Sequence, residues 1–140
     1  MIGIVIAAHD HLADALQRAA NSVLGEQENM VSIAIDPSDG APDIQKKFEQ
    51  AIRAFDAAEG VLILTDMFGG TPSNIGLTMH KGGKVEVLTG VNLPMVIKAA
   101  QLADRSDDLA GVARSIRDVG VSSITVASDL LGKGREGGHE

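Results

Sequence analysis

The chain has 140 residues, no cysteine and a formal net charge of −7 at pH 7. This length is typical of a single domain. The lack of cysteine excludes disulfides and thiolate chemistry, and the acidic balance argues against nucleic acid or an anionic membrane as a partner. No apolar run approaches the roughly 20 residues of a membrane-spanning helix. No basic segment precedes the first apolar residues, so we expect a cytoplasmic protein without direct membrane insertion.

Strands and helices are predicted to alternate along the chain. Short apolar runs predict strands, and apolar residues at helical spacing predict the helices between them. Gly25 is expected to end the first helix. The predicted order is strand 2–7, helix 12–24, strand 30–35, helix 44–55, strand 61–64, helix 72–80, strand 85–88, helices 93–103 and 109–119, and strand 122–127.

This alternation predicts an α/β fold with an open, mostly parallel, doubly wound sheet and helices on both of its faces. The expected strand order is 2-1-3-4, numbered along the chain. The fifth strand follows two successive helices, so no short crossover fixes its place. Residues 1–127 are the predicted domain, and the polar, glycine-rich residues 128–140 are expected to form a disordered tail.

The central stretch, GVLILTDMFGGTPSN at residues 60–74, joins a buried strand to a helix. A carboxylate, Asp66, ends the apolar run, and a glycine turn follows it. Thr71 suits a helix N-cap and Pro72 the first helical position. A helix N-terminus beside a glycine turn presents unpaired N–H groups to an anion. The same residues also fit an ordinary capped connection between a strand and a helix.

Two residues able to carry proton or phosphoryl chemistry follow predicted strands: His9 and Asp66. In open α/β sheets, ligands bind at the carboxyl ends of the strands, where the strand order reverses. The order 2-1-3-4 makes these two strands neighbours, about 4.8 Å apart. Asp66 would then accept one ring N–H of His9 and leave Nε2 free as a nucleophile. Taken singly, His9 also fits a helix cap and Asp66 a turn residue.

The turn after Asp66 supplies the other candidate site residues. Phosphoryl charge is expected to be stabilised by the N–H groups of Gly69, Gly70, Thr71 and Ser73 and by the Thr71 hydroxyl. The apolar residues beside this turn are predicted to contact a partner protein: Met67 and Phe68.

Several other kinds of site are not supported by the residues. His9-Asp10-His11 resembles the paired histidines of metal-dependent hydrolases, but no third ligand is visible, so we expect no metal. His11 is expected to be solvated, and His80 to lie at a helix C-terminus, where a cation is favourable. His139 is expected to be inert. The sequence has no phosphate loop, dinucleotide fingerprint or GxSxG elbow. A small phosphoryl-accepting domain without a nucleotide site or cofactor remains.

Three segments resemble the enzyme IIA component of the mannose family of the bacterial phosphoenolpyruvate-dependent sugar phosphotransferase system. They are GIVIAAHDHLADAL near the N-terminus, LTDMFGGTPSN at the centre and TGVNLPM at 89–95, and the resemblance spans residues 1–127. It implies a cytoplasmic phosphocarrier whose histidine, matching His9, takes phosphoryl from HPr and passes it to a IIB domain, in sugar uptake or its regulation. It also implies Asp66 as the paired aspartate and Thr71 as the hydroxyl residue after the glycines.

The resemblance also bears on assembly. It implies a homodimer in which the fifth strand, 121–127, pairs with the sheet edge of the partner subunit. The chain ends soon after that strand, so we expect a IIA protein that stands alone rather than one fused to IIB.

Two other functions fit the same features. The phosphotransfer subunit of a dihydroxyacetone kinase shares the fold and the leading histidine, although the GGTPSN and GVNLPM segments weigh against it. A non-catalytic, regulatory anion-binding module could use the same pocket.

Overall fold

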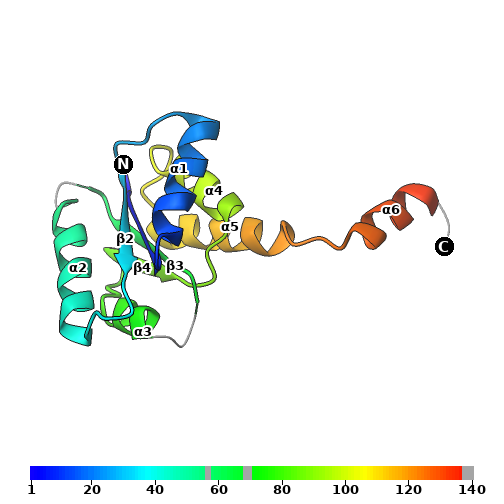
Figure 1. The fold of residues 1–140 in the computed structure, drawn as a ribbon. Helices are drawn as coiled ribbons and strands as arrows, with labels where there is room; N and C mark the ends of the chain where they lie inside the picture. The colour runs from blue at the N-terminus through cyan, green and yellow to red at the C-terminus, as the bar shows by residue number, and fades with distance from the viewer. Residues whose placement is uncertain (56–57, 68–70, 137–140) are drawn as a thin grey trace.

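The computed structural model describes residues 1–55, 58–67 and 71–136, and for 71–73 and 133–136 it describes the backbone alone. Its body is a sheet between two layers of helices. A C-terminal segment, residues 121–136, projects from this body and is called the arm below (Figure 1). The elements are β1 (Gly3–His9), α1 (Leu12–Leu24), β2 (Met30–Ile35), α2 (Ala41–Arg53), β3 (Val61–Thr65), α3 (Thr71–Thr78), β4 (Val85–Leu88), α4 (Leu93–Leu102), α5 (Leu109–Ser122) and α6 (Ala127–Glu136).

The sheet has four parallel strands in the order β2-β1-β3-β4, which confirms the predicted order. β1 and β3 are neighbours in register, with Gly3 opposite Val61 and Ala7 opposite Thr65. The carboxyl ends of these two central strands therefore lie side by side, where the strand order reverses. This is the position at which open α/β sheets bind ligands.

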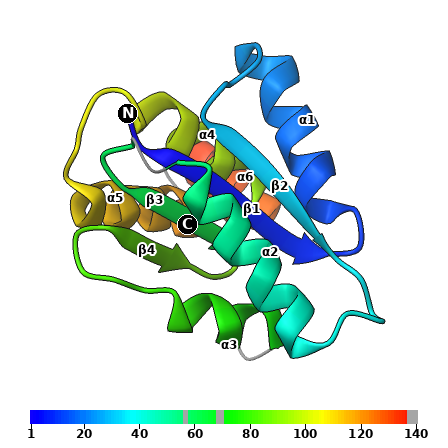
Figure 2. The same cartoon turned by 90° about the vertical axis from the view of Figure 1, so that its left-hand side faces the viewer.

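Alternation along the central strands builds a core on each face of the sheet. Ile4 and Ile6 of β1 pack on the face covered by α1, α4 and α5, while Val5 and Ala7 pack on the face covered by α2 and α3 (Figure 2). All five residues of β3 are buried. Burial on both faces explains why these strands appear in the sequence as continuous apolar runs rather than alternating ones.

Two of the local signals for helix ends match the structure, and two helix ends differ from the predicted ones. Gly25 follows α1 with φ 89°, the left-handed conformation that glycine adopts without steric cost. Asn92 caps α4, because its side-chain oxygen accepts the N–H of Met95 at 3.1 Å. α2 begins at Ala41, earlier than the apolar spacing indicated, and α5 continues past Gly120 to Ser122. Within the described residues, no helix is both long and apolar enough to cross a membrane.

The C-terminal arm differs from the sequence-based expectation. Residue 122 is the last of α5, residues 123–126 pair with no strand, and the helix α6 occupies 127–136, where a disordered tail was expected. A strand forms only beside another strand, and the arm of this single chain extends away from its own sheet (Figure 1). The fifth strand is therefore not formed within one chain, and its pairing with a second copy stays a prediction.

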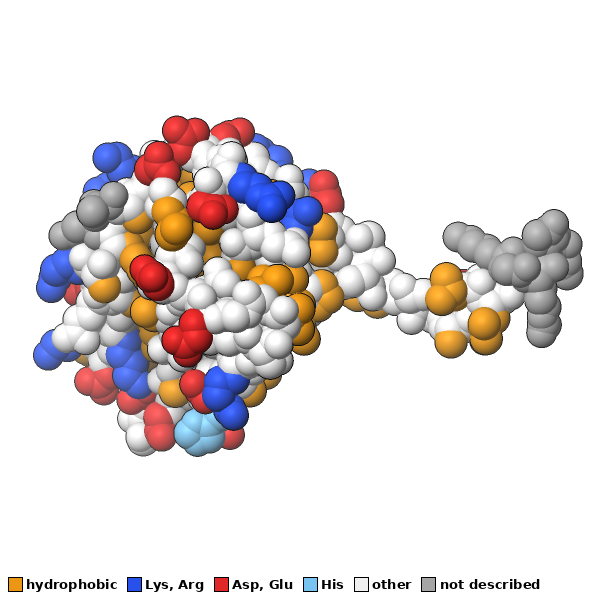
Figure 3. All heavy atoms as spheres, turned by 90° about the horizontal axis from the view of Figure 1, so that it is seen from above, with side chains coloured by type: hydrophobic (Ala, Val, Ile, Leu, Met, Phe, Trp, Pro, Cys, Tyr) orange, Lys and Arg blue, Asp and Glu red, His pale blue; other side chains and the backbone are white. Residues whose placement is uncertain are grey.

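The arm carries apolar side chains that have nothing to pack against. Val121, Ile124 and Val126 are 66%, 77% and 62% exposed, and Leu130 and Leu131 of α6 are exposed to a similar degree. Hydrophobic side chains are visible along this projection in the space-filling view (Figure 3). Such a concentration of exposed apolar residues is unusual for the surface of a monomer.

Candidate active site

His9 and Asp66 meet at the carboxyl edge of the sheet, as the sequence predicted. His9 is the last residue of β1, and Asp66 directly follows β3. One carboxylate oxygen, Oδ2 of Asp66, lies 2.8 Å from His9 Nδ1 and also accepts the main-chain N–H of His9 at 3.0 Å. The carboxylate thus holds both the ring and the backbone of the same residue.

The two side chains differ in their exposure to solvent. That of His9 is 49% exposed, whereas that of Asp66 is only 13% exposed. Burial raises the pKa of Asp66, but the hydrogen bonds from the main chain and ring of His9 lower it by more, so the net pKa lies below the ordinary value of 3.8. Asp66 is therefore ionised at neutral pH and acts only as a hydrogen-bond acceptor.

An ionised acceptor at Nδ1 determines the tautomer of the histidine. Because the carboxylate carries no proton to donate, Nδ1 of His9 must carry the N–H of the 2.8 Å contact. The other ring nitrogen, Nε2, then has a lone pair, and it makes no hydrogen bond to any residue that the structure describes. A half-exposed imidazole oriented in this way is suited to nucleophilic attack on an incoming electrophile.

The helix that follows Asp66 contributes its N-terminus to the same side of the sheet. α3 begins at Thr71, within one residue of the predicted start. Gly69, Gly70 and Phe68 lie outside the described residues, so their predicted roles stay predictions. The same holds for the side chains of Thr71 and Ser73. Met67 is 51% exposed, directly after the site aspartate.

The other histidines do not join this pair. The side chain of His11 is 86% exposed and lies 3.7 Å from Asp10, and His80 is 3.7 Å from Glu86, beside the edge strand β4. His139 lies outside the described residues. No group of three or more His, Asp or Glu side chains arranged to hold a metal ion occurs among the residues that were described.

One feature of the site could not be expected from the sequence. Asp10, next to the site histidine, has φ 56°, the left-handed region that aspartate tolerates better than most residues. Its main-chain N–H donates to the carbonyl of Ile35 at 2.9 Å, which continues the β1–β2 ladder through this turn. The turn reverses the chain directly after His9 and thereby leaves the imidazole at the rim of the sheet.

The lowered pKa of Asp66 predicts a specific dependence of stability on acid. The contribution of this carboxylate to the free energy of unfolding is complete above pH 3.8 and is lost as the pH falls through its lower folded-state pKa. Between about pH 5 and about pH 2.5, we expect Asp66→Asn to lose less stability than the wild type, as measured by urea unfolding. An equal loss in both proteins would contradict this.

The same titration contains an internal control. Asp36 and Asp39 also have lowered pKa values, through hydrogen bonds from Ser38 and Lys47 respectively. Both remain in the wild type and in the variant, so the difference between the two proteins isolates Asp66.

The fold and the site together define a doubly wound α/β domain with a histidine–aspartate pair at its switch point. Residues 3–116 match the family EIIA-man, described as "PTS system fructose IIA component". The chain belongs to this family, whose members are phosphotransferase components.

Individual relatives agree with this family. The chain is 27% identical over 134 residues to the "PTS system fructose-specific EIIA component" of Bacillus subtilis (strain 168), covering 95% of this chain and 91% of that protein. It is 32% identical over 127 residues to the "PTS system mannose-specific EIIAB component" of Escherichia coli (strain K12), covering 88% of this chain but only 39% of that protein. A crystal structure of "phosphotransferase system component EIIA" from Streptococcus agalactiae superposes with a TM-score of 0.83 at 25% identity, covering 92% of this chain and 99% of that one.

Proposed function

We propose that this protein is a phosphohistidine carrier, in which His9 accepts a phosphoryl group from HPr and passes it to a IIB domain in sugar uptake or its regulation. The observation that carries the proposal is the contact between Asp66 Oδ2 and His9 Nδ1, because it leaves Nε2 as the free nucleophile. Membership in the EIIA-man family supports the same assignment.

Each group at the site has a separate task in this proposal. The lone pair of Nε2 forms a bond to phosphorus while the bond from phosphorus to the donor group breaks. Asp66 keeps the proton on Nδ1 and balances the positive charge that the ring gains. The N–H groups at the start of α3 and the Thr71 hydroxyl then stabilise the phosphoryl oxygens. Asp66 lies on the Nδ1 side of the ring, so it does not face the incoming phosphate.

The direct test is to incubate the protein with phosphoenolpyruvate, enzyme I and HPr and to record its mass. A carrier gains one acid-labile phosphoryl group and loses it again when a IIB domain is added. A non-catalytic, anion-binding module gains none, so an unchanged mass would exclude the carrier function. The family match weighs against a dihydroxyacetone kinase subunit.

We also propose that HPr docks on the exposed apolar residues beside the site. Met67 is half exposed next to Asp66, and Leu12, which opens α1 just after the histidine turn, is 44% exposed. Met67 follows the end of β3, and Leu12 follows the end of β1, the strand that ends in His9. Phe68, the next residue after Met67, is proposed to belong to the same contact surface.

The proposed assembly is a homodimer in which residues 121–127 of one subunit add to the sheet edge of the other. This pairing would give the exposed Ile124 and Val126 a surface to pack against. We expect deletion of residues 121–140 to convert the dimer to monomers or aggregates, as measured by light scattering. A control that deletes only 137–140 should remain dimeric. A dimer that survives the longer deletion would exclude the arm as the dimer seam.

A further inference from the structure

The two outer edges of the sheet are closed to further strands by different means. Along β2, the outward carbonyl of Met30 accepts from Gln17 Nε2 at 3.0 Å, and that of Ala34 accepts from Lys47 Nζ at 2.8 Å. Both donors come from helices packed on the body, Gln17 from α1 and Lys47 from α2. The β2 edge is therefore held closed by side chains anchored elsewhere.

Along β4, the outward main-chain groups are covered by residues close to them in the sequence. The N–H and carbonyl of Val85 pair with Lys81 in an isolated antiparallel bridge, at 2.8 and 2.9 Å. The outward N–H of Val87 donates to the side chain of the preceding residue, with Glu86 Oε2 at 3.3 Å. At this position the edge is thus covered by one long, partly buried side chain, whose other carboxylate oxygen, Oε1, lies 3.7 Å from His80 Nε2.

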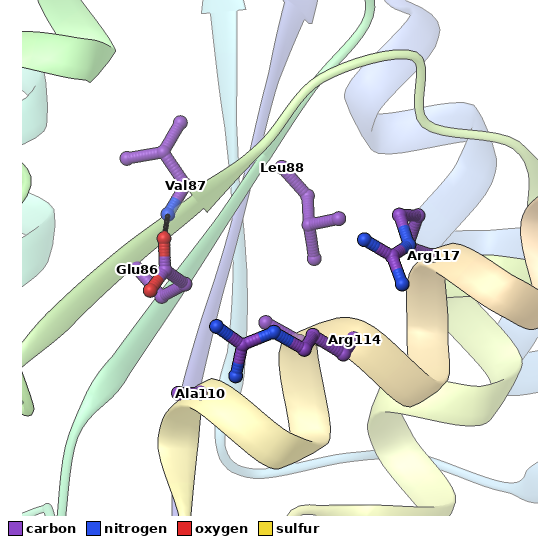
Figure 4. Close-up of a pocket in the computed structure, with 7 residues that line it drawn as sticks. Glu86, Val87, Leu88, Ala110, Arg114 and Arg117 are labelled. Carbon is purple, nitrogen blue, oxygen red and sulfur yellow. Dashed lines mark hydrogen bonds between the residues drawn. The ribbon is translucent and has the colours of Figure 1, made fainter.

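A groove lies directly beside this covered N–H. Its volume is about 170 Å³, and it is bounded by Glu86–Leu88 of β4 and by Ala110, Ala113, Arg114 and Arg117 of α5. In the close-up, both arginine side chains extend from α5 toward β4, with Arg114 toward the end of the groove that holds Glu86 (Figure 4). Within the described residues, no carboxylate lies within ion-pair distance of Arg114.

We propose that Glu86 is a releasable cap on the β4 edge: the arm of a second copy of this chain displaces it from Val87 N–H, and the freed carboxylate turns into the groove to pair with Arg114. The direction of the movement follows from the pleat. Val87 packs on the α2 and α3 face, so Glu86 projects from the opposite face, which α5 covers. An added strand occupies the plane of the sheet, so the carboxylate leaves both Val87 N–H and His80 Nε2 and turns to the α5 side.

The arm of a second copy is the occupant that the exposed residues favour. Residues 123–126 are in no helix or strand, and Ile124 and Val126, two positions apart, would share one face of an added strand. The arm leaves from the C-terminal end of α5, the helix that forms the other wall of the groove. This inference rests on the proposed homodimer and adds the residues that set its strength.

The test is the dissociation constant of the dimer, measured by sedimentation over a range of concentrations. In the Arg114→Ala background, where the freed carboxylate has no arginine to pair with, Glu86→Ala leaves Val87 N–H free for the arm and should tighten the dimer about 3- to 10-fold, the effect of one ordinary hydrogen bond. Glu86→Gln, whose amide oxygen can still accept that N–H, should tighten it less. Glu49→Ala is the matched control, because it removes the same charge from an exposed position on α2. Equal tightening by Glu49→Ala would overturn the cap in favour of net charge.

Substitution of Arg114 provides the second part of the test. Arg114→Ala should weaken the dimer when Glu86 is present and have little effect in the Glu86→Ala background, a coupling that a purely structural arginine would not show. Independent effects would overturn the pairing. A dimer whose strength does not respond to Glu86→Ala in the Arg114→Ala background would overturn the cap alone, whereas a wild-type protein that stays monomeric would overturn the cap and the homodimer together. Phosphorylation of His9 in the same samples reports on the carrier function separately.

Discussion

Replacing His9 by glutamine should abolish phosphorylation of the chain by phosphoenolpyruvate, enzyme I and HPr. Glutamine is close to histidine in size and can still accept or donate hydrogen bonds, so the fold should be kept while the nucleophile is lost. Of the residues described at the carboxyl ends of the central strands, His9 alone presents a ring nitrogen there. Mass spectrometry of the intact protein should find no phosphoryl group on the variant.

The matched control is His11→Gln. His11 is almost fully exposed and lies two residues further along the chain, so its loss should leave phosphorylation competent. Phosphopeptide mapping of the wild type decides between the histidines. Label on His11 or His80 would refute the assignment of the site.

Replacing Asp66 by alanine should slow phosphotransfer by about 10²- to 10⁴-fold, the range typical of positioned groups that handle protons in catalysis. The variant loses the contact at Nδ1, so the imidazole is free to rotate and to change its tautomer. It should still fold, because the core residues of β1 and β3 are untouched. Rapid-quench measurement of phosphoryl transfer from phosphorylated HPr gives the rate.

Two further variants make that result specific. Asp14→Ala removes an exposed carboxylate on α1 whose ion-pair partner among the described residues is Arg18, and it should transfer at the wild-type rate. Asp66→Asn keeps an oxygen that can accept the ring N–H, so its rate should fall between those of the wild type and Asp66→Ala. A near-normal rate in Asp66→Ala would show that the carboxylate does not orient the nucleophile.

Much of the fold could be predicted because its signals are local. The ranges of β2 and β4 match the predicted ones, since each is a short apolar run bounded by turn residues. The order β2-β1-β3-β4 followed from the general rules for alternating strands and helices. Once β1 and β3 were neighbours, the meeting of His9 and Asp66 followed from their positions at the two strand ends.

Other features depend on contacts that no local pattern encodes. The second hydrogen bond of Asp66, to the main chain of His9, depends on how far the end of β3 extends relative to the end of β1. The sequence does not show this alignment. The left-handed turn at Asp10 occurs at a residue that is also common in ordinary loops. Residues 122–127 were predicted as a strand, but strand formation there depends on a neighbouring strand that one chain does not supply.

Because one carboxylate oxygen of Asp66 contacts both the ring and the main chain of His9, the position of the reacting nitrogen depends on how β1 and β3 are aligned. Asp66 directly follows β3, and the groups that its Oδ2 holds, the ring and the main chain of His9, belong to β1. A slip of one strand past the other by a single residue, about 3.3 Å, would break both contacts at once. A change in the β1–β3 register would therefore also move Nε2, the nitrogen that reacts in the proposed function.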